Sequence, residues 1–467
     1  MSQGSKYSSA RLGKRLAALA AAILPNETAK NGTWFKRRLR AIGRFVAPAA
    51  AFAHVSSYFA AAVVVGGVLC AVVAVLPFGG ADCVAAAGEP ATPGSLPAKP
   101  GASGDATPLV FGEQIEFSDE QTQRKLAGRM VLVAQDGGWL FQGRDGVLWA
   151  VPPGRQLGRA PLAPPLPALS PDEYARQMTS ELPRGFEVYQ TAHYVILHDT
   201  SRAYAQWCGA LFERLYMAFH NYWTRKGLKL HDPPFPLCAI VFADEKNYLK
   251  YSRPVLGEAA DSMIGYYHLM TNRMVMFDLT GRAGQRGVSR AATVAAINES
   301  LSQGESLRTV ATIIHEATHQ IAFNCGMHTR LSDTPLWLCE GVAIYFETPD
   351  LSSTKGWRGI GAVNGPRVAQ WRDYLRRRPA DSLVRLIEDD RRFRDARQSL
   401  DAYAEAWLLT YFLINQRSRP YLDYLTLVSA KPPLIEDGAE KRRAEFERHF
   451  GPIDKLDRDL LRYARGL

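Results

Sequence analysis

The sequence predicts an α+β protein in which a mixed sheet comes first and helices follow, carried behind a membrane-spanning segment. Three observations indicate this order. A charge-free apolar segment lies near the N-terminus, strand-like runs separated by turns follow it, and helical periodicity dominates beyond Gly284. With 467 residues, of which 47% are hydrophobic, the chain can bury one sizeable core and a second, smaller one.

The positive charge of the chain is concentrated at its start. Of a net charge of +10, residues 1–44 carry ten Lys or Arg against one acid, Glu27, which leaves the remainder close to neutral at +1. No charged residue of the Asp, Glu, Lys or Arg type occurs from Phe45 to Ala81. Within that segment Tyr58–Phe78 is apolar and, at about 20 residues, long enough to cross a bilayer as a helix. Because a basic block next to a membrane-spanning segment is explained by membrane orientation, we expect no nucleic-acid partner.

The positive-inside rule predicts the orientation of this segment. The basic leader, residues 1–44, stays in the cytoplasm and everything after Asp82 is exported, which describes a single-pass protein of the cell membrane. A cleaved signal peptide is the alternative, because Val-Ala-Ala-Ala follows at residues 84–87. The long basic leader favours an uncleaved anchor over residues 58–78.

Two segments connect the anchor to the main domain. Residues 85–108 are rich in Pro, Ala, Gly and Ser and have little to bury, so we expect a flexible linker. From 109 to 153, short apolar runs alternate with Asp-Gly turn signals, which predicts a small β meander. A Pro-rich stretch at 160–171 reads as a second connector.

The main domain is predicted to span residues 172–467, with strands before helices. The expected elements are strands at Phe186–Leu197, Leu237–Ala243, Met263–Met270 and Arg273–Leu279, and helices at Arg202–Arg225, Pro366–Arg378, Leu400–Asn415 and Glu440–Phe450.

The sequence His-Glu-x-x-His at residues 315–319 indicates a metal site. Spacing by four residues in a helix puts the imidazoles of His315 and His319 on one face, one turn apart, where both can bind one metal ion. Thr334 and Pro335 then predict the start of a second helix, in which Glu340 falls in the second turn.

Three protein ligands, His315, His319 and Glu340, leave one tetrahedral position open, which is the composition of a catalytic zinc site. Glu316 is not needed as a ligand and can take a proton from the metal-bound water. The competing interpretation is two core histidines with a glutamate nearby.

These residues resemble a known family. His-Glu-Ala-Thr-His followed by Trp-Leu-Cys-Glu-Gly-Val-Ala is similar to the gluzincin group of zinc metallopeptidases, in which a downstream glutamate supplies the third ligand. More closely, the chain resembles an uncharacterised exported bacterial domain-of-unknown-function family assigned to the same peptidase clan. The resemblance covers roughly residues 186–415 and implies a zincin-like fold: a sheet-bearing upper part, an active-site helix and a helical lower part.

The resemblance also implies a mode of substrate binding. In relatives, the edge strand just upstream of the active-site helix pairs with an extended peptide, and the corresponding segment here is Met274–Leu279. The expected contacts are made by Met274, Val275, Met276 and Phe277. The expected partner is therefore a peptide or protein substrate. Because the Gly-x-Met-Glu-Asn type of exopeptidase signature is absent, we expect endopeptidase action.

Gluzincins commonly add a tyrosine or histidine that stabilises the oxyanion of the tetrahedral intermediate. Tyr403, at the start of a long predicted helix, is similarly placed downstream of the metal ligands, and an ordinary helix-face tyrosine is the alternative. His328, in the loop after the first helix, is the other candidate donor, although a loop histidine is more often solvated.

Further side chains near the motif have two interpretations each. Glu347 either orients a ligand imidazole or, as the sequence favours, forms an exposed salt bridge. The basic clusters Arg376–Arg378 and Arg391–Arg394 read as solvated helix faces, with substrate attraction as the alternative. Cys325 and Cys339 flank the loop between the two halves of the motif and either form a disulfide or stay as buried thiols.

The sequence hypothesis is a membrane-anchored, exported zinc endopeptidase with Glu316 as its general base. One alternative is a zincin-like binding or scaffold protein without turnover. Another is a zinc hydrolase that acts on an ester or a cell-wall amide, because water activation is the same for these substrates.

Overall fold

The computed structural model describes residues 69–70, 109–119, 122–281, 293–302, 304–348, 351, 357 and 359–467. The predicted basic leader and linker lie outside these residues, as does the predicted anchor except for Leu69–Cys70, which form the two-residue strand β1. Within the part of the chain that is described, no helix is both long and apolar enough to span a membrane. The described residues fall into a small β unit, from 110 to 168, and a larger unit that continues from 169 to the C-terminus.

The small unit is a five-stranded antiparallel sheet with the order β5-β4-β3-β2-β6. Its core contains Ile115, Phe117, Phe141 and Val151. The strands are β2 (Val110–Ser118), β3 (Gln123–Val133), β4 (Trp139–Gly143), β5 (Leu148–Val151) and β6 (Gln156–Pro167).

The sheet of the small unit extends beyond the predicted meander, because the Pro-rich stretch read as a connector is strand β6. Strand β6 pairs with β2 alone, so it lies at the edge of the sheet. Proline lacks the N–H that a central strand needs on both sides, but an edge strand needs it on one side only. The prediction of an irregular connector at 160–171 is therefore wrong over most of its length.

The larger unit begins with a helix and a sheet in which the strands follow the order β10-β11-β9-β8-β7, and the two-residue strand β1, from residues 69–70, is hydrogen-bonded to the outer side of β10 as a sixth strand. Strand β9 runs parallel to both β8 and β11, whereas β7/β8 and β10/β11 are antiparallel hairpins. The elements of this half are α3 (Pro171–Glu181), β7 (Glu187–Gln190), β8 (Tyr194–His198), α4 (Arg202–Arg225), β9 (Leu237–Phe242), α5 (Glu245–Leu256), β10 (Gly265–His268), β11 (Arg273–Phe277) and α6 (Val294–Leu301).

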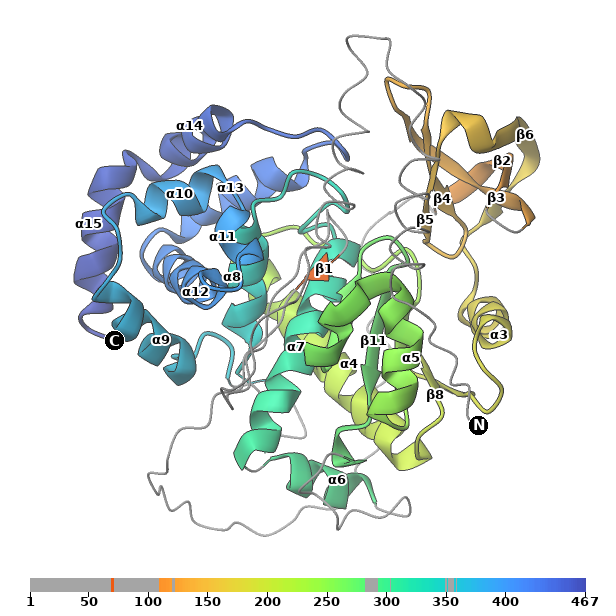
Figure 1. The fold of residues 1–467 in the computed structure, drawn as a ribbon, viewed down its shortest axis with the longest axis horizontal. Helices are drawn as coiled ribbons and strands as arrows, with labels where there is room; N and C mark the ends of the chain where they lie inside the picture. Colours follow the sequence, from red (N-terminus) through yellow and green to blue (C-terminus); the bar gives the residue numbers. More distant parts are fainter. Residues whose placement is uncertain are drawn as a thin grey trace, which may run out of the picture. The chain divides into compact units, whose positions relative to one another are not determined.

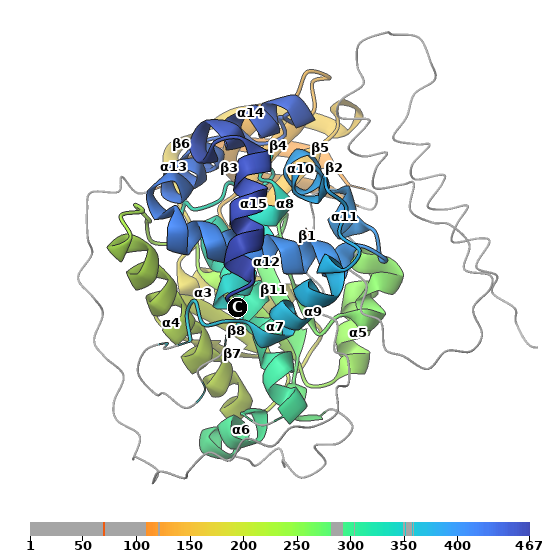
Figure 2. The same cartoon turned by 90° about the vertical axis from the view of Figure 1, so that its left-hand side faces the viewer.

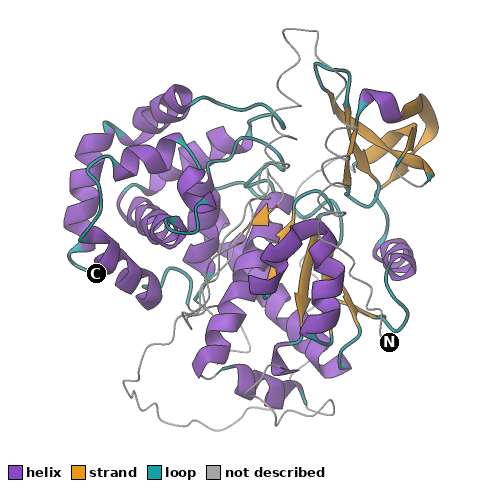
Figure 3. Ribbon diagram, viewed as in Figure 1, coloured by secondary structure: helices purple, strands orange, loops and turns teal. Residues whose placement is uncertain are grey.

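The helices that follow complete the larger unit, and Figure 3 shows that no strand of the described chain interrupts them. They are α7 (Gly304–Asn324), α8 (Leu336–Phe346), α9 (Gly365–Leu375), α10 (Ser382–Glu388), α11 (Arg391–Arg394), α12 (Ser399–Gln416), α13 (Ser418–Ser429), α14 (Ala439–Phe450) and α15 (Ile453–Ala464). The predicted order of a mixed sheet followed by helices is confirmed. One predicted strand, Phe186–Leu197, is instead the hairpin β7/β8, which turns at Thr191–His193.

Helix α7 lies between the sheet and the C-terminal helices of the larger unit (Figure 1). On one side it packs against β10, β11 and α4, and on the other against α8, which in turn packs on α12. Figure 2 shows the same arrangement from the side, with α12 lying across the helical part. A helix in this position is surrounded by protein, which explains how the β-branched run Thr309–Ile314 stays helical despite its low intrinsic propensity.

Close packing of α8 on α12 depends on a glycine. A Cβ at Gly341 would overlap Thr410 Oγ1 and lie 3.0 Å from the Ala406 carbonyl oxygen, both on α12. The glycine that follows Glu340 therefore lets the two helices approach, and this approach fixes the depth of Glu340 in the core.

Candidate metal centre

The three predicted ligands meet at one point. His315 and His319 project from α7 toward Glu340 on α8, and all three side chains are buried. One ligand atom from each lies within 4.8 Å of the others, and this is the one such group of metal-ligating side chains in the described residues. The helical spacing that predicted the site is thus realised in three dimensions.

The distances within the triad suit a tetrahedral ion. The two Nε2 atoms are 3.0 Å apart, and Glu340 Oε2 lies 3.1 Å from His315 Nε2 and 3.4 Å from His319 Nε2. A tetrahedral ion with bonds of about 2.0–2.1 Å separates its ligand atoms by about 3.3 Å. Glu340 Oε1 is buried and has no hydrogen-bond partner, so the site also carries an unsatisfied oxygen beside the converging atoms. The residues present therefore fit a metal ion.

Electrostatics favour an ionised carboxylate in the triad. Burial alone would raise the pKa of Glu340, but the neighbouring His319 and His315 lower it to about 2. A ligand carboxylate that stays deprotonated is what metal binding requires.

One carboxylate oxygen of Glu316 is bound to the sheet. Its Oε2 accepts a hydrogen bond from the backbone N–H of Tyr267 in β10, at 2.8 Å, while its buried Oε1 has no hydrogen-bond partner. Burial raises the pKa of Glu316 to about 8, although both neighbouring histidines oppose that shift. A carboxylate that is held through one oxygen and has no hydrogen-bond partner on the other is suited to accepting a proton.

Glu347 holds one ligand histidine in place. Its Oε1 lies 2.9 Å from His315 Nδ1, and the carboxylate accepts hydrogen bonds from Arg367 at 3.2 and 3.4 Å and from Asn364 at 3.2 Å. The expected exposed salt bridge of Glu347 is wrong, because the side chain is 5% exposed. With its proton on Nδ1, the His315 ring presents the lone pair of Nε2 to the metal position.

The other ligand histidine has a different partner. His319 Nδ1 lies 3.3 Å from Cys339 Sγ, and Cys339 directly precedes the ligand Glu340 in α8. Cys325 Sγ lies instead 3.0 Å from His220 Nε2. Both cysteines are free and buried, so the Cys325–Cys339 disulfide is not formed and the alternative of buried thiols is confirmed.

The two candidate oxyanion donors are both buried. His328 is 2% exposed, so the expectation of a solvated loop histidine is wrong, and neither ring nitrogen has a hydrogen-bond partner. Burial and the neighbouring His319 lower the pKa of His328 to about 3, whereas Glu340 opposes that shift. Tyr403, in the first turns of α12, packs its ring edge-on against Phe393 and under the guanidinium of Arg367, 5.6 Å from the ring centroid.

The predicted peptide-pairing strand is not at the edge of the sheet. Strand β11, which contains Met274, Val275, Met276 and Phe277, is hydrogen-bonded to β10 on one side and to β9 on the other. The hairpin places its first strand, β10, outside its second, so β11 has no free backbone edge and its side chains are buried. The prediction of these four residues as a peptide-pairing edge is wrong, and β10, which contacts Glu316, lies outside them.

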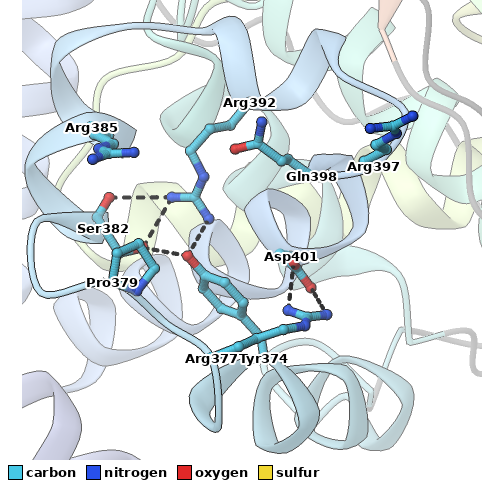
Figure 4. A pocket seen from close by; sticks show the side chains of 9 residues that line it. All are labelled: Tyr374, Arg377, Pro379, Ser382, Arg385, Arg392, Arg397, Gln398 and Asp401. Atoms are coloured by element: carbon cyan, nitrogen blue, oxygen red, sulfur yellow. Dashed lines mark hydrogen bonds and ion pairs between the residues drawn. The ribbon is translucent and has the colours of Figure 1, made fainter.

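The basic clusters are more buried than predicted. Arg378 pairs with Glu405 and Asp457, and Arg392 pairs with Glu405, so these two side chains connect α11, α12, α15 and the segment that follows α9. Figure 4 shows Arg392 inside this part of the molecule, next to Ser382 and Tyr374. The prediction of solvated helix faces is wrong for Arg378 and Arg392, whereas Arg376 and Arg391 are exposed.

Three contributors to the site have no signal in the sequence. Arg367 and Asn364 reach Glu347 from the segment that starts α9, and the Tyr267 N–H reaches Glu316 from the sheet.

The start of α8 also differs from the prediction: Pro335 is its N-cap, and the Leu336 N–H is capped by the distant Asp390 at 2.9 Å, with no cap from Thr334. Contacts between segments so far apart depend on tertiary packing.

Comparison with known proteins gives one match. A family described as "Protein of unknown function (DUF1570)" matches residues 309–435, which contain the three candidate ligands, Glu316 and Tyr403. No curated protein and no solved structure matches the chain. The predicted similarity to an uncharacterised domain-of-unknown-function family is confirmed over that segment.

Proposed function

We propose that this protein is a zinc-dependent hydrolase that cleaves peptide bonds, with a gluzincin-like metal centre in a zincin-like fold. The observation that carries the proposal is the convergence of His315, His319 and Glu340 on one point, with Glu316 beside them and free of that ligand set. Two imidazoles and one carboxylate leave a fourth position for water, which distinguishes a catalytic from a structural zinc site.

The residues around the metal position would have separate roles in hydrolysis. A bound zinc ion would make a water molecule acidic near neutral pH and polarise the scissile carbonyl group. Glu316 accepts the proton of the attacking water at Oε1 while the Tyr267 N–H holds Oε2, and then passes that proton to the leaving nitrogen. His328 or Tyr403 donates a hydrogen bond to the carbonyl oxygen as negative charge develops on it.

The position of β10 supports a peptide substrate. Its backbone runs directly past Glu316, and an extended peptide aligned with a strand presents its carbonyl groups at regular intervals. Because Met274–Phe277 are enclosed, we assign recognition of the peptide backbone to β10, at the part of its outer side that the two-residue strand β1 does not cover. The Gly265–His268 segment is then the part of the sheet whose alteration changes substrate affinity.

The general base is tested by Glu316→Gln in the full-length chain. We expect unchanged zinc content and folding but a loss of peptide cleavage of roughly 10²–10⁴-fold, because the amide cannot accept the proton. Glu440→Gln, an equivalent change at an exposed position of α14, is the matched control and keeps wild-type activity. Wild-type cleavage by Glu316→Gln at full zinc occupancy contradicts the mechanism. Absence of cleavage of any peptide or ester by the zinc-loaded wild type supports a scaffold instead.

Tyr403→Phe and His328→Gln separate the two oxyanion donors. The residue that acts as the donor loses roughly 10²–10³-fold in kcat when replaced, because a hydrogen bond made in the transition state is removed. Zinc content is measured beside the rate for both variants. Unchanged kcat in both variants would assign the oxyanion donor to another group.

We further propose that the protein is anchored in the cell membrane with the hydrolase outside the cytoplasm, on the basis of the basic leader and the apolar span in the sequence. With that span in the bilayer, Leu69–Cys70 would not pair with β10. Protease added outside intact spheroplasts should digest residues 109–467 and spare the leader. Release of a soluble form that begins near Ala87 would favour a cleaved signal peptide.

A further inference from the structure

A second polar site lies among helices α9 to α12, in a cavity with a volume of about 310 Å³ (Figure 4). Four of the nine residues that line it are arginines, namely Arg377, Arg385, Arg392 and Arg397, and Asp401 is the one carboxylate among them. Such a volume is at the lower end of the range for sites that bind small molecules. The composition of the lining indicates the charge of what it would hold.

Arg392 forms a fixed, buried part of this cavity. Its side chain is 8% exposed, and its guanidinium donates to Ser382 Oγ at 3.2 Å and to Tyr374 Oη at 3.0 Å (Figure 4). Its counter-charge, Glu405, is fully buried, is shared with Arg378, and does not line the cavity. Arg392 is therefore held in place by an acid that lies behind it.

The other arginines are oriented differently. Arg377 is bound to both oxygens of Asp401, at 2.8 and 3.0 Å, so the lining carboxylate is already neutralised. Arg385 pairs with Asp381, which is not part of the lining. The exposed side chain of Arg397 makes no hydrogen bond or ion pair with any residue that the structure describes. The pKa of nearby Asp395 is lowered by a hydrogen bond from the Arg397 backbone N–H and, to a smaller extent, by the charge of the Arg397 side chain. Arg397 thus has all its side-chain donors available.

The start of helix α12 adds to the positive potential of the cavity. Gln398, its N-cap, and the acidic Asp401, in its first turn, both line the cavity, and the N-cap side chain makes no capping hydrogen bond. The Ser399 N–H donates to the Asp395 carbonyl oxygen at 2.8 Å, and the Gln398 side chain donates to the Asp395 carboxylate at 2.6 Å. The N-terminus of a helix carries unsatisfied N–H groups and a partial positive charge, which favour anions. The guanidinium groups and the helix end therefore both make the electrostatic potential of the cavity more positive.

We propose that this cavity binds a small molecule through an oxyanion, a carboxylate or a phosphate group. The planar fork of a guanidinium matches either group with two parallel hydrogen bonds. Arg397 and Arg385 reach the ligand from the exposed side, Arg392 faces it from the buried side, and the ring of Tyr374 borders its apolar part. The proposal is independent of the zinc-dependent activity, because none of these side chains belongs to the metal centre.

The test is calorimetric titration of the full-length chain with inorganic phosphate and, separately, with citrate. We expect saturable binding of one anion per chain to at least one of the two probes. In Arg385→Gln/Arg397→Gln the affinity should fall by about tenfold for each guanidinium removed, because charge-assisted hydrogen bonds are lost. Arg225→Gln, which removes an exposed arginine at the end of α4, is the matched control and should bind like the wild type.

The pattern of binding decides the outcome. Loss of phosphate binding in the double variant identifies a phosphoryl ligand, and loss of citrate binding identifies a carboxylate ligand. Equal binding by the wild type and the double variant would indicate an adventitious ion only and would overturn the proposal. Absence of saturable binding of both probes at millimolar concentration would overturn it as well. Neither readout requires metal or hydrolase activity.

Discussion

His315 and His319 lie one turn apart on the same helix, yet the structure supports them in different ways. His315 is backed by a buried carboxylate, Glu347, which is itself held by Arg367 and Asn364. His319 is backed by the thiol of Cys339. A carboxylate is a strong, charged hydrogen-bond acceptor and a thiol is a weak one. The two histidines of the candidate metal centre are therefore backed by hydrogen-bond partners of different strength.

This difference follows from where the partners originate. Cys339 belongs to α8 and is positioned by the same helix that supplies Glu340, so the His319 side of the site is local in structure. Glu347 lies just after α8 and requires Arg367 and Asn364 from the segment that begins α9. Burial would raise the pKa of Glu347, but Arg367 and His315 lower it, so the carboxylate stays charged. The His315 side thus depends on packing between distant segments.

The largest effect is expected for Glu347→Gln. The His315 ring loses its charged partner, so zinc affinity should fall by about 10–100-fold, the usual range for partners of ligand histidines. Competition with a chromophoric chelator measures this affinity. Arg367 is left without its counter-charge, which also lowers the free energy of unfolding.

Adding Arg367→Met separates these two consequences of the Glu347 change. In Glu347→Gln/Arg367→Met we expect recovery of stability but not of zinc affinity, because the buried cation is gone while the ligand partner is still absent. Recovery of both would show that Glu347 acts through packing alone and would remove the contrast between the histidines.

An intermediate effect is expected for Gly341→Ala, which tests whether α8 positions Glu340 by its contact with α12. The added methyl group overlaps Thr410 Oγ1 and crowds the Ala406 carbonyl, so we expect a loss of about 1–3 kcal/mol in the free energy of unfolding. Denaturant titration of the zinc-free protein measures it. Thr410→Ala in the same background should restore part of the loss, whereas an unchanged midpoint for Gly341→Ala would contradict the close approach.

The smallest effect is expected for Cys339→Ala. A thiol accepts only a weak hydrogen bond from His319 Nδ1, so zinc affinity should fall by less than about tenfold, below the range expected for Glu347. Cys325→Ala, which removes the other buried thiol near α7, serves as the control and should leave zinc affinity unchanged. If Cys339→Ala weakens zinc binding as much as Glu347→Gln does, the proposed asymmetry is wrong.

The candidate ligands could be predicted from the sequence because the signals for them lie within a few consecutive residues. Imidazoles four residues apart must share a helix face, and the helix Arg202–Arg225 is found as predicted. In the structure Ser201 caps its first turn, and Gly227, with a φ of 94°, follows its end. The same reasoning locates Glu340, which falls on the next helix. These features need only a few consecutive residues, and the structure reproduces them.

Features set by tertiary packing were not accessible in this way. Whether β11 or β10 lies outside depends on how the hairpin joins β9, and alternation along a strand does not reveal it. Arg392 and His328 look like exposed helix-face and loop residues by composition, but packing of distant elements buries both side chains. Asp390 caps α8 across 54 residues, although Thr334 and Pro335 supply a local capping signal.

Zinc stoichiometry tests the central claim most directly. Elemental analysis of the purified full-length chain should find about one zinc ion per chain, and Glu340→Ala should lose most of it, because two imidazoles alone hold the ion poorly. A zinc content in Glu340→Ala equal to that of the wild type, or a wild type that takes up no zinc when it is supplied, would contradict a metal centre formed by His315, His319 and Glu340.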